Sequence, residues 1–235
     1  MIVIAVKGLA MRALHFVFVI SLLLIPGAAS AEMQISVYGG ANTVSDSDLT
    51  LDTGPGSTDF EVDWEGKSFE APPYYGVRGT YWLDGFAESR WGVAVDFTHA
   101  KAYADIEGAL AGSFSGLQFT HGLNLLTLNG LYRAPLNDRF SLYGGAGAGI
   151  NVPHVQAGTL APAGSISEYQ LTGPAVQGLA GASMGLGHGF SMFGEYKGSY
   201  SWNNVDLDSG SSLETDLFVH HFALGLSLTF GGAEE

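Results

Sequence analysis

Apolar side chains alternate with small or polar ones in stretches of about ten residues that recur from residue 33 onward. In the last stretch Phe222, Leu224 and Leu226 share one face, and Ala223 and Gly225 share the other. A period of two is that of a β-strand, and a tilted transmembrane strand needs about ten residues. The pattern predicts eight strands, at Met33–Gly40, Tyr74–Leu83, Trp91–Ala100, Leu123–Arg133, Phe140–Val152, Thr172–Leu186, Phe190–Trp202 and Phe218–Phe230.

The connections between these strands alternate in length. The long ones span about residues 41–73, 101–122, 153–171 and 203–217, and the short ones span 84–90, 134–139 and 187–189. Long outer loops and short periplasmic turns are typical of outer-membrane barrels. We therefore expect an all-β fold, namely an eight-stranded antiparallel up-and-down transmembrane β-barrel of the outer membrane.

The first 31 residues have the pattern of a secretory signal peptide, in which basic residues precede a short apolar run, here Phe16–Ile25. Ala29-Ser30-Ala31 forms a small-residue cleavage site. The run is shorter than the about 20 apolar residues of a membrane-spanning helix, and a retained anchor or a start at Met11 are the alternatives. We expect cleavage near Ala31, a barrel over residues 32–235, and a location in the bacterial outer membrane.

Composition and charge exclude several other classes. The chain has 34 glycines and no cysteine, which disfavours a helical bundle and excludes disulfide-stapled domains and cysteine-ligated metal centres. Without residues 1–31 it holds 23 acidic and seven basic residues. A surface this acidic repels nucleic acid, because nucleic-acid-binding proteins present basic patches.

Four charged residues fall within the predicted strands, away from the strand ends, namely Arg78, Asp96, Glu195 and Lys197. A cation that faces lipid at the membrane midplane costs about 2–4 kcal/mol, so these side chains are expected to face the lumen or the rim. Buried charges are normally paired, which favours a salt-bridge network that plugs the barrel. A catalytic or gating role is the alternative.

Three histidines fall at the outer ends of strands that are neighbours in an up-and-down barrel. They are His99, His121 and His154. Imidazole is a common ligand of transition metals, and three protein ligands with an open position are typical of catalytic sites. Asp96, Asp105 or Glu168 could add a carboxylate. The alternative is that these histidines form ordinary hydrogen bonds at the membrane interface.

Familiar nucleotide-binding and hydrolase motifs are absent from the chain. There is no G-x-S-x-G elbow and no phosphate-binding G-x-x-x-x-G-K-[ST] loop. The glycine-rich run Gly144–Gly149 lies within a predicted strand and no helix follows it, so it does not indicate a dinucleotide site. Neither a flavin nor a nicotinamide motif is present.

Several unusual sequence strings resemble those of the outer-membrane lipid A oxidases, and together they cover most of residues 60–230. The strings are Trp64–Glu70, Pro72–Arg78, Asp96–Lys101, Phe119–Asn124, Pro153–Val155, Glu168–Ala175 and Phe193–Trp202. This resemblance implies oxidation of the proximal glucosamine of lipid A to 2-aminogluconate, with molecular oxygen as the acceptor. The substrate must already lack its 1-phosphate, because the reaction needs a free hemiacetal.

The resemblance implies the reaction and the partners, whereas the candidate site residues follow from the geometry of the outer rim and from the absence of a flavin or nicotinamide motif. A divalent transition metal held by His99, His121 and His154 would handle oxygen. The candidate catalytic residues are Asp96, Glu168, Tyr169 and Glu195, and the candidates for binding the anionic groups of the substrate are Lys67, Arg78, Lys101 and Lys197. The expected partners are lipid A or lipopolysaccharide and other outer-membrane lipids, and we expect a monomer.

Two other functions remain open. The first is a non-enzymatic small barrel with a structural or surface-interaction role, in which the three histidines would be dispensable. The second is a lipid A deacylase on a similar scaffold. Those barrels use a His-x-Ser pair, which neither His121-Gly122-Leu123 nor His154-Val155-Gln156 supplies.

Overall fold

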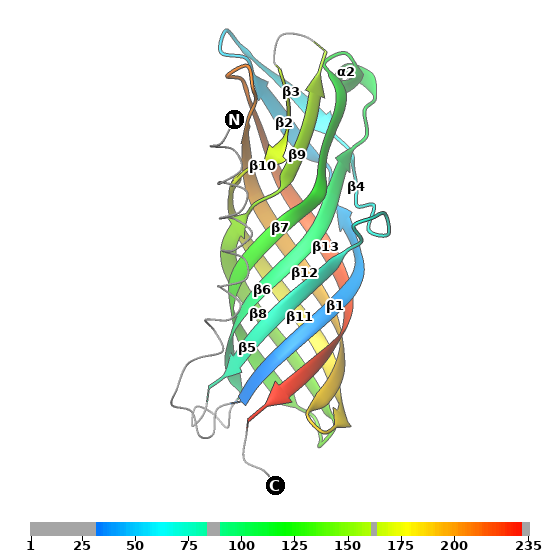
Figure 1. Ribbon diagram of the computed structural model, residues 1–235, viewed down its shortest axis with the longest axis vertical. Helices are drawn as coiled ribbons and strands as arrows, with labels where there is room; N and C mark the ends of the chain where they lie inside the picture. The colour runs from blue at the N-terminus through cyan, green and yellow to red at the C-terminus, as the bar shows by residue number, and fades with distance from the viewer. Residues whose placement is uncertain (1–31, 84–89, 161–163, 232–235) are drawn as a thin grey trace, which may run out of the picture. The chain divides into compact units, whose positions relative to one another are not determined.

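A computed structural model describes residues 32–83, 90–160 and 164–231 of the chain, except for the side chains of residues 120 and 121. The predicted signal peptide therefore lies outside the described residues. The described part contains eight long strands, which Figure 1 shows wrapped around one axis. They are β1 (Glu32–Val44), β5 (Tyr75–Trp82), β6 (Trp91–Ala104), β7 (Phe114–Pro135), β8 (Phe140–Asn151), β11 (Gly173–Gly187), β12 (Phe190–Asp206) and β13 (Ser212–Phe230).

Each long strand pairs antiparallel with its neighbours along the chain, and the ring closes where β1 pairs with β13. The register of the closing pair runs from Met33 opposite Phe230 to Val44 opposite Val219. Closure satisfies the backbone hydrogen bonds of every strand, which a membrane-spanning sheet requires. The predicted eight-stranded antiparallel barrel is confirmed, and each predicted strand lies largely within one of the eight observed strands.

The side chains of the lower barrel alternate as the sequence predicts. On β13 Phe222, Leu224 and Leu226 are exposed on the outer surface, whereas Ala223 and Ser227 are buried inside. The outer apolar belt suits lipid, and the small inner residues suit the narrow lumen of eight strands.

The glycine-rich run lies inside β8, as predicted, and it lets β8 approach β7 closely. A Cβ atom on Gly149 would lie 1.9 Å from the carbonyl oxygen of Leu126. A Cβ atom on Gly145 would lie 2.2 Å from the carbonyl oxygen of Gly130. A side chain at either position would therefore force the two strands apart.

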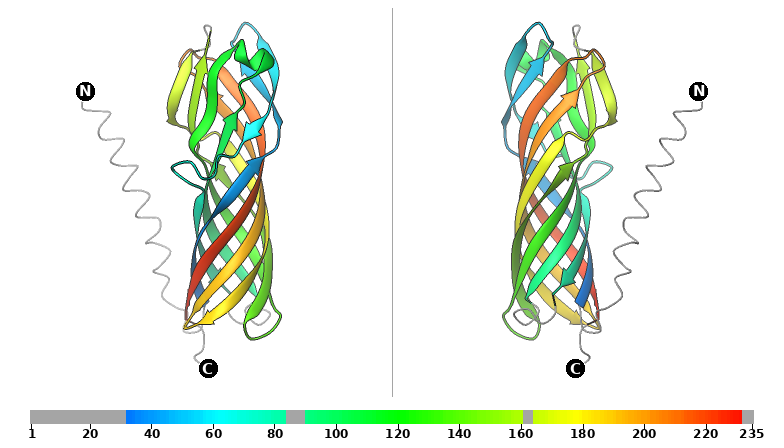
Figure 2. Two further views of the ribbon diagram at one scale, coloured as in Figure 1. Left: turned by 90° about the vertical axis from the view of Figure 1, so that its right-hand side faces the viewer. Right: turned by 90° about the vertical axis from the view of Figure 1, so that its left-hand side faces the viewer.

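The segments predicted as long outer loops are mostly strand, which extends the barrel wall beyond the apolar belt (Figure 2). Short strands pair with one another and with the outer ends of β6, β7 and β13. They are β2 (Ser47–Asp52), β3 (Ser57–Val62), β4 (Trp64–Glu65), β9 (His154–Thr159) and β10 (Ser165–Tyr169), with the helical turn α2 (Gly108–Ala111) beside them. We call this region the outer extension. No helix in the described part of the chain has the length and hydrophobicity needed to cross a membrane.

The outer extension encloses an apolar core of its own. Leu49, Val62, Phe119, Leu213 and Leu217 are among its buried members. Loop residues would leave backbone polar groups unpaired, whereas strand pairing satisfies them and holds the apolar side chains together. Apolar side chains therefore fill the outer half of the lumen.

Candidate functional site

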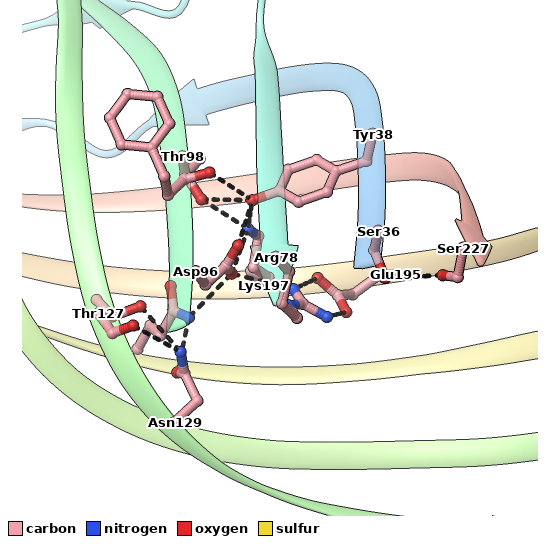
Figure 3. A network of polar contacts seen from close by, with 12 residues as sticks. Ser36, Tyr38, Arg78, Asp96, Thr98, Thr127, Asn129, Glu195, Lys197 and Ser227 are labelled. Atoms are coloured by element: carbon pink, nitrogen blue, oxygen red, sulfur yellow. Dashed lines mark hydrogen bonds and ion pairs between the residues drawn. The ribbon is translucent and has the colours of Figure 1, made fainter. Parts of the chain in front are cut away.

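Four charged side chains meet in the lumen at the level of the membrane, as the sequence predicts. The Arg78 guanidinium donates to both carboxylate oxygens of Glu195, at 2.7 and 2.6 Å, and to Asp96 Oδ2 at 3.0 Å. The Lys197 amine donates to the same Asp96 oxygen at 3.1 Å. Figure 3 shows the group from close by. Strands β5, β6 and β12 supply it, so it ties together distant parts of the barrel wall.

Neutral side chains complete this lumen network. The Tyr38 hydroxyl donates to Asp96 Oδ1 at 2.7 Å and accepts from the Lys197 amine at 2.7 Å. The Gln177 amide donates to Asn129 Oδ1 at 2.7 Å and lies 3.3 Å from Asp96 Oδ2. Lys197 is fully buried. Removing water strengthens each of these contacts, and the paired charges make the burial tolerable.

The network accounts for four of the predicted site residues. The candidate catalytic carboxylates Asp96 and Glu195 are the partners of the candidate substrate-binding cations Arg78 and Lys197. Among the described side chains, the carboxylates and cations of this group are matched in number. The arrangement is that of the structural plug that the sequence favours.

A second group lies on the outward face of the barrel, where the apolar belt ends. The His99 ring stacks on Tyr75, with the ring centres 4.9 Å apart, and His99 Nδ1 is 2.9 Å from Asn124 Oδ1. The Asn124 amide nitrogen donates to the carbonyl oxygen of Val152 at 3.0 Å. His99 is only 3% exposed although its strand neighbour Phe97 faces lipid on the same side.

His154 and Tyr169 extend this group along the outer rim. Their rings meet edge to face across the β9–β10 pair, with centres 4.8 Å apart. Tyr169 is within electrostatic range of Tyr75, and we therefore group the two pairs of rings. We call Tyr75, His99, Asn124, His154 and Tyr169 the outer-face cluster.

Local backbone geometry makes the recess that His99 occupies. Gly122 has φ +97°, and a Cβ atom there would lie 2.2 Å from His99 Nδ1. The register of β6 against β7 shifts at the same level, between Ala100 and Ala102. Only glycine leaves room for the imidazole at this bulge.

The described residues do not test the predicted three-histidine metal site. His99 and His154 belong to the outer-face cluster, whereas the side chain of His121 is not described. The described residues contain no group of three or more histidine, aspartate or glutamate side chains that could hold a metal ion. The three-histidine site therefore stays a prediction.

Two predicted cations lie above the outer-face cluster. The Lys67 amine is 4.6 Å from the centre of the Tyr103 ring and the Lys101 amine is 5.9 Å from it. The Lys101 amine also donates to the carbonyl oxygen of Glu70 at 2.8 Å. Burial raises the pKa of the Tyr103 phenol and the Glu70 carboxylate adds to the rise, so the phenol stays neutral at physiological pH. Lys101 follows His99 by two residues on β6.

The predicted catalytic set thus divides between two places. Asp96 and Glu195 lie in the lumen, and Tyr169 lies on the outer face. Glu168 is exposed on β10, where its carboxylate accepts from the Gln170 amide at 3.2 Å. The sequence reasoning missed Tyr38 and Asn124. The first shares the inward face of its strand with Ser36, which is a usable signal, but no pattern singles out the second.

Comparisons with known proteins agree with the fold. No protein-family model and no curated protein matches the sequence. The crystal structure of the outer-membrane protein OprG from Pseudomonas aeruginosa aligns with a TM-score of 0.55 at 15% identity, covering 86% of this chain and 97% of OprG. The outer-membrane protein AlkL aligns at 0.49 and 18% identity, covering 90% and 96%. Neisserial surface protein A aligns at 0.46 and 12% identity, covering 85% and 97%.

These findings define the class to which the molecule belongs by its architecture. The chain has the fold of the small outer-membrane β-barrel proteins. At identities this low the likeness concerns the fold alone, and the chemistry has to be argued from the site.

Proposed function

We propose that this chain is an outer-membrane lipid A oxidase, which converts the proximal glucosamine of lipid A lacking the 1-phosphate to 2-aminogluconate. The observation that carries the proposal is the outer-face cluster. It places two imidazoles, an amide and two phenols at the outer edge of the apolar belt. The sugar of an outer-leaflet lipid lies at that level while its acyl chains lie along the belt. The substrate then reaches the site laterally, without entering the barrel.

The lumen is a poor place for this chemistry. Its carboxylates already accept hydrogen bonds from Arg78, Lys197 and Tyr38, and each of these groups is buried. The apolar core of the outer extension lies above them. A sugar head group would have to displace both, whereas on the outward face Tyr75 and Tyr169 are 42% and 48% exposed and can be reached without displacing the plug.

The contacts of Asn124 assign the protons of His99. The amide nitrogen is engaged by the carbonyl oxygen of Val152, so the amide oxygen is the atom that faces His99. That oxygen accepts from Nδ1–H, which leaves the imidazole lone pair on Nε2. Nε2 is buried, so its lone pair suits ligation of a small metal ion better than direct contact with a sugar hydroxyl.

The reaction balances with oxygen as the only acceptor. The hemiacetal carbon loses its hydrogen and its hydroxyl loses a proton, two electrons pass to O2, and the products are a lactone and hydrogen peroxide. Water then opens the lactone, so the acid is heavier than the substrate by one oxygen atom. A divalent transition metal would supply the redox chemistry when bound. Among the described residues, His99 and His154 are the ones that would contribute ligands to it.

Lys67 is the proposed contact for an anionic group of lipid A, because its side chain is 34% exposed and its pairing with Glu65, at 3.5 Å, is on the surface. Lys101 is only 1% exposed and does not reach the surface. Their amines lie beside the same Tyr103 ring, and Lys101 follows His99 by two residues on β6. An ammonium group pairs well with phosphate. Arg78 and Lys197 do not share this role, because the lumen carboxylates bind them.

Mass spectrometry of lipid A tests the proposal. Membranes containing the protein are incubated with lipid A lacking the 1-phosphate, in air and under nitrogen. We expect a gain of one oxygen atom in air only, and loss of this product in the triple variant His99→Ala, His121→Ala and His154→Ala. Unchanged lipid A with a folded wild-type barrel in both gases would overturn the proposal.

The acidity of the outer extension favours one alternative, a surface-interaction barrel. Fifteen of the 23 acidic residues fall in the four outer segments, against two of the nine basic ones. Glu61, Glu214 and Asp216 are exposed there. Such a barrel would tolerate the triple histidine variant, so the same experiment distinguishes the two functions.

A further inference from the structure

The periplasmic half of the lumen holds a cavity that the proposed function does not use. Its volume is about 870 Å³. The lumen network closes it above at Arg78, and residues of the short turns, including Asp138, Arg139 and Gly187, line it below. Short turns mark the periplasmic end of an outer-membrane barrel. The cavity is therefore a cup on the periplasmic side of the plug.

Three successive inward residues of β5 line this cup and carry buried polar atoms without partners. These atoms are Arg78 Nε, Thr80 Oγ1 and Trp82 Nε1, on side chains that line the cavity and whose residues are each 3% exposed. None of these three atoms has a hydrogen-bond partner among the described residues. All three carry a proton to donate.

Buried donors without partners are costly, at about 1–3 kcal/mol each, so a row of them calls for an acceptor. Tyr143 also lines the cup, close to the Arg78–Glu195 pair. Arg133 lines it too and is paired with Glu32. Its guanidinium bonds to Glu32 at 3.1 and 2.6 Å and lies 4.3 Å from the Trp82 ring centre.

Apolar side chains also line the cup. Leu131 and Phe193 are buried inward residues, whereas Phe140 and Met184 lie at its edge. An occupant that satisfies the whole surface has acceptor oxygens at one end and an apolar body at the other. Small-molecule sites in proteins commonly combine the two in this way.

We propose that the cup binds a small organic anion from the periplasm, a carboxylate or phosphate ester with an apolar group. The anionic oxygens accept from Arg78 Nε–H, Trp82 Nε1–H and the Thr80 hydroxyl. The apolar group lies against Leu131 and Phe193. Binding here is independent of lipid A chemistry on the outer face, from which the lumen network separates it.

Nuclear magnetic resonance of the folded barrel in lipid nanodiscs tests this site. The indole N–H signal of Trp82 is assigned by its loss in Trp82→Phe, and the probes are phenyl phosphate, benzoate and the neutral benzyl alcohol. We expect a saturable shift of the Trp82 signal with one or both anions. The signals of Trp91 and Trp202, which face outward, should not move.

Matched threonine variants locate the contact. Thr80→Val should weaken anion binding about tenfold, the value of one hydrogen bond to a charged group. Thr229→Val alters the same cavity at a hydroxyl that already accepts from Gln34 at 3.2 Å, and should leave binding unchanged. The proposal is overturned by a shift that never saturates, by equal shifts with benzyl alcohol, or by equal losses in both variants. A shift that never saturates would mean that water alone fills the cup.

Discussion

The two halves of β13 have opposite polarity, although one strand with one period of two runs through both. In the membrane half, Leu224 points outward and is 73% exposed, while Ala223 is buried inside. In the outer half, Glu214 points outward and Leu213 is buried inside. The reversal shows that the surrounding solvent decides which face of a strand is apolar. Lipid requires apolar side chains outside, and water requires them inside.

The same reversal explains why the lumen has two kinds of filling. Beneath the apolar belt no water reaches the outer surface, so polar residues gather inside and satisfy one another, as Arg78, Asp96 and Lys197 do. Above the belt the outer surface is wet and acidic, and the inside packs as the core of a soluble protein, with Leu213 and Leu217 among its members. The lumen network thus fills the barrel at the level of the membrane, and the apolar core of the outer extension fills it above.

Breaking the polar plug should have the largest effect. Asp96→Asn leaves Arg78 and Lys197 with a single carboxylate between them, and removing one partner of a buried pair costs about 3–5 kcal/mol. We expect a loss of that size in the free energy of unfolding, measured by denaturant titration in lipid vesicles.

The matched control for this variant is Asp216→Asn in the outer extension. Asp216 accepts from the exposed Tyr200 hydroxyl at 2.7 Å, and exposed charged contacts contribute about 0–1 kcal/mol. Equal losses in the two variants would contradict the distinction between a desolvated network and a wet surface.

Adding one cation to each half of the outward face of β13 sharpens the comparison. Leu224→Arg should lower the free energy of unfolding by about 2–4 kcal/mol, because the guanidinium would face lipid. Glu214→Arg, on the same face but above the belt, should change it by no more than about 1 kcal/mol. A similar cost at both positions would place Glu214 within the membrane and refute the reversal. The same denaturant titration measures both variants.

The sequence predicts the membrane part of the fold well, because its apolar face is continuous and its period is regular. Where the polarity reverses, the strands predicted from the sequence are shorter than those in the structure. The seventh was expected to end at Trp202 and β12 runs to Asp206, and the fourth was expected to begin at Leu123 and β7 begins at Phe114. The prediction depends on an apolar face toward lipid, and that face stops where the outward residues become acidic. The two-residue alternation of the strand continues beyond that point.

The candidate site is only partly predictable for a related reason. Alternation places Arg78, Asp96, Glu195 and Lys197 in the lumen, but their pairing depends on the stagger of β5, β6 and β12, which no single strand encodes. The recess of His99 depends on the bulge at Gly122, and a lone glycine in a strand has many meanings. The metal remains a prediction because His121 is not described.

The most direct test compares two adjacent residues of β6 that face opposite ways. His99 belongs to the outer-face cluster, whereas the Thr98 hydroxyl accepts from the Lys197 amine in the lumen at 2.8 Å. His99→Gln and Thr98→Val are assayed for oxidised lipid A in air, after each barrel is shown to be folded. We predict that His99→Gln abolishes the product and that Thr98→Val retains it. Retention in His99→Gln with loss in Thr98→Val would place the chemistry in the lumen and contradict the account.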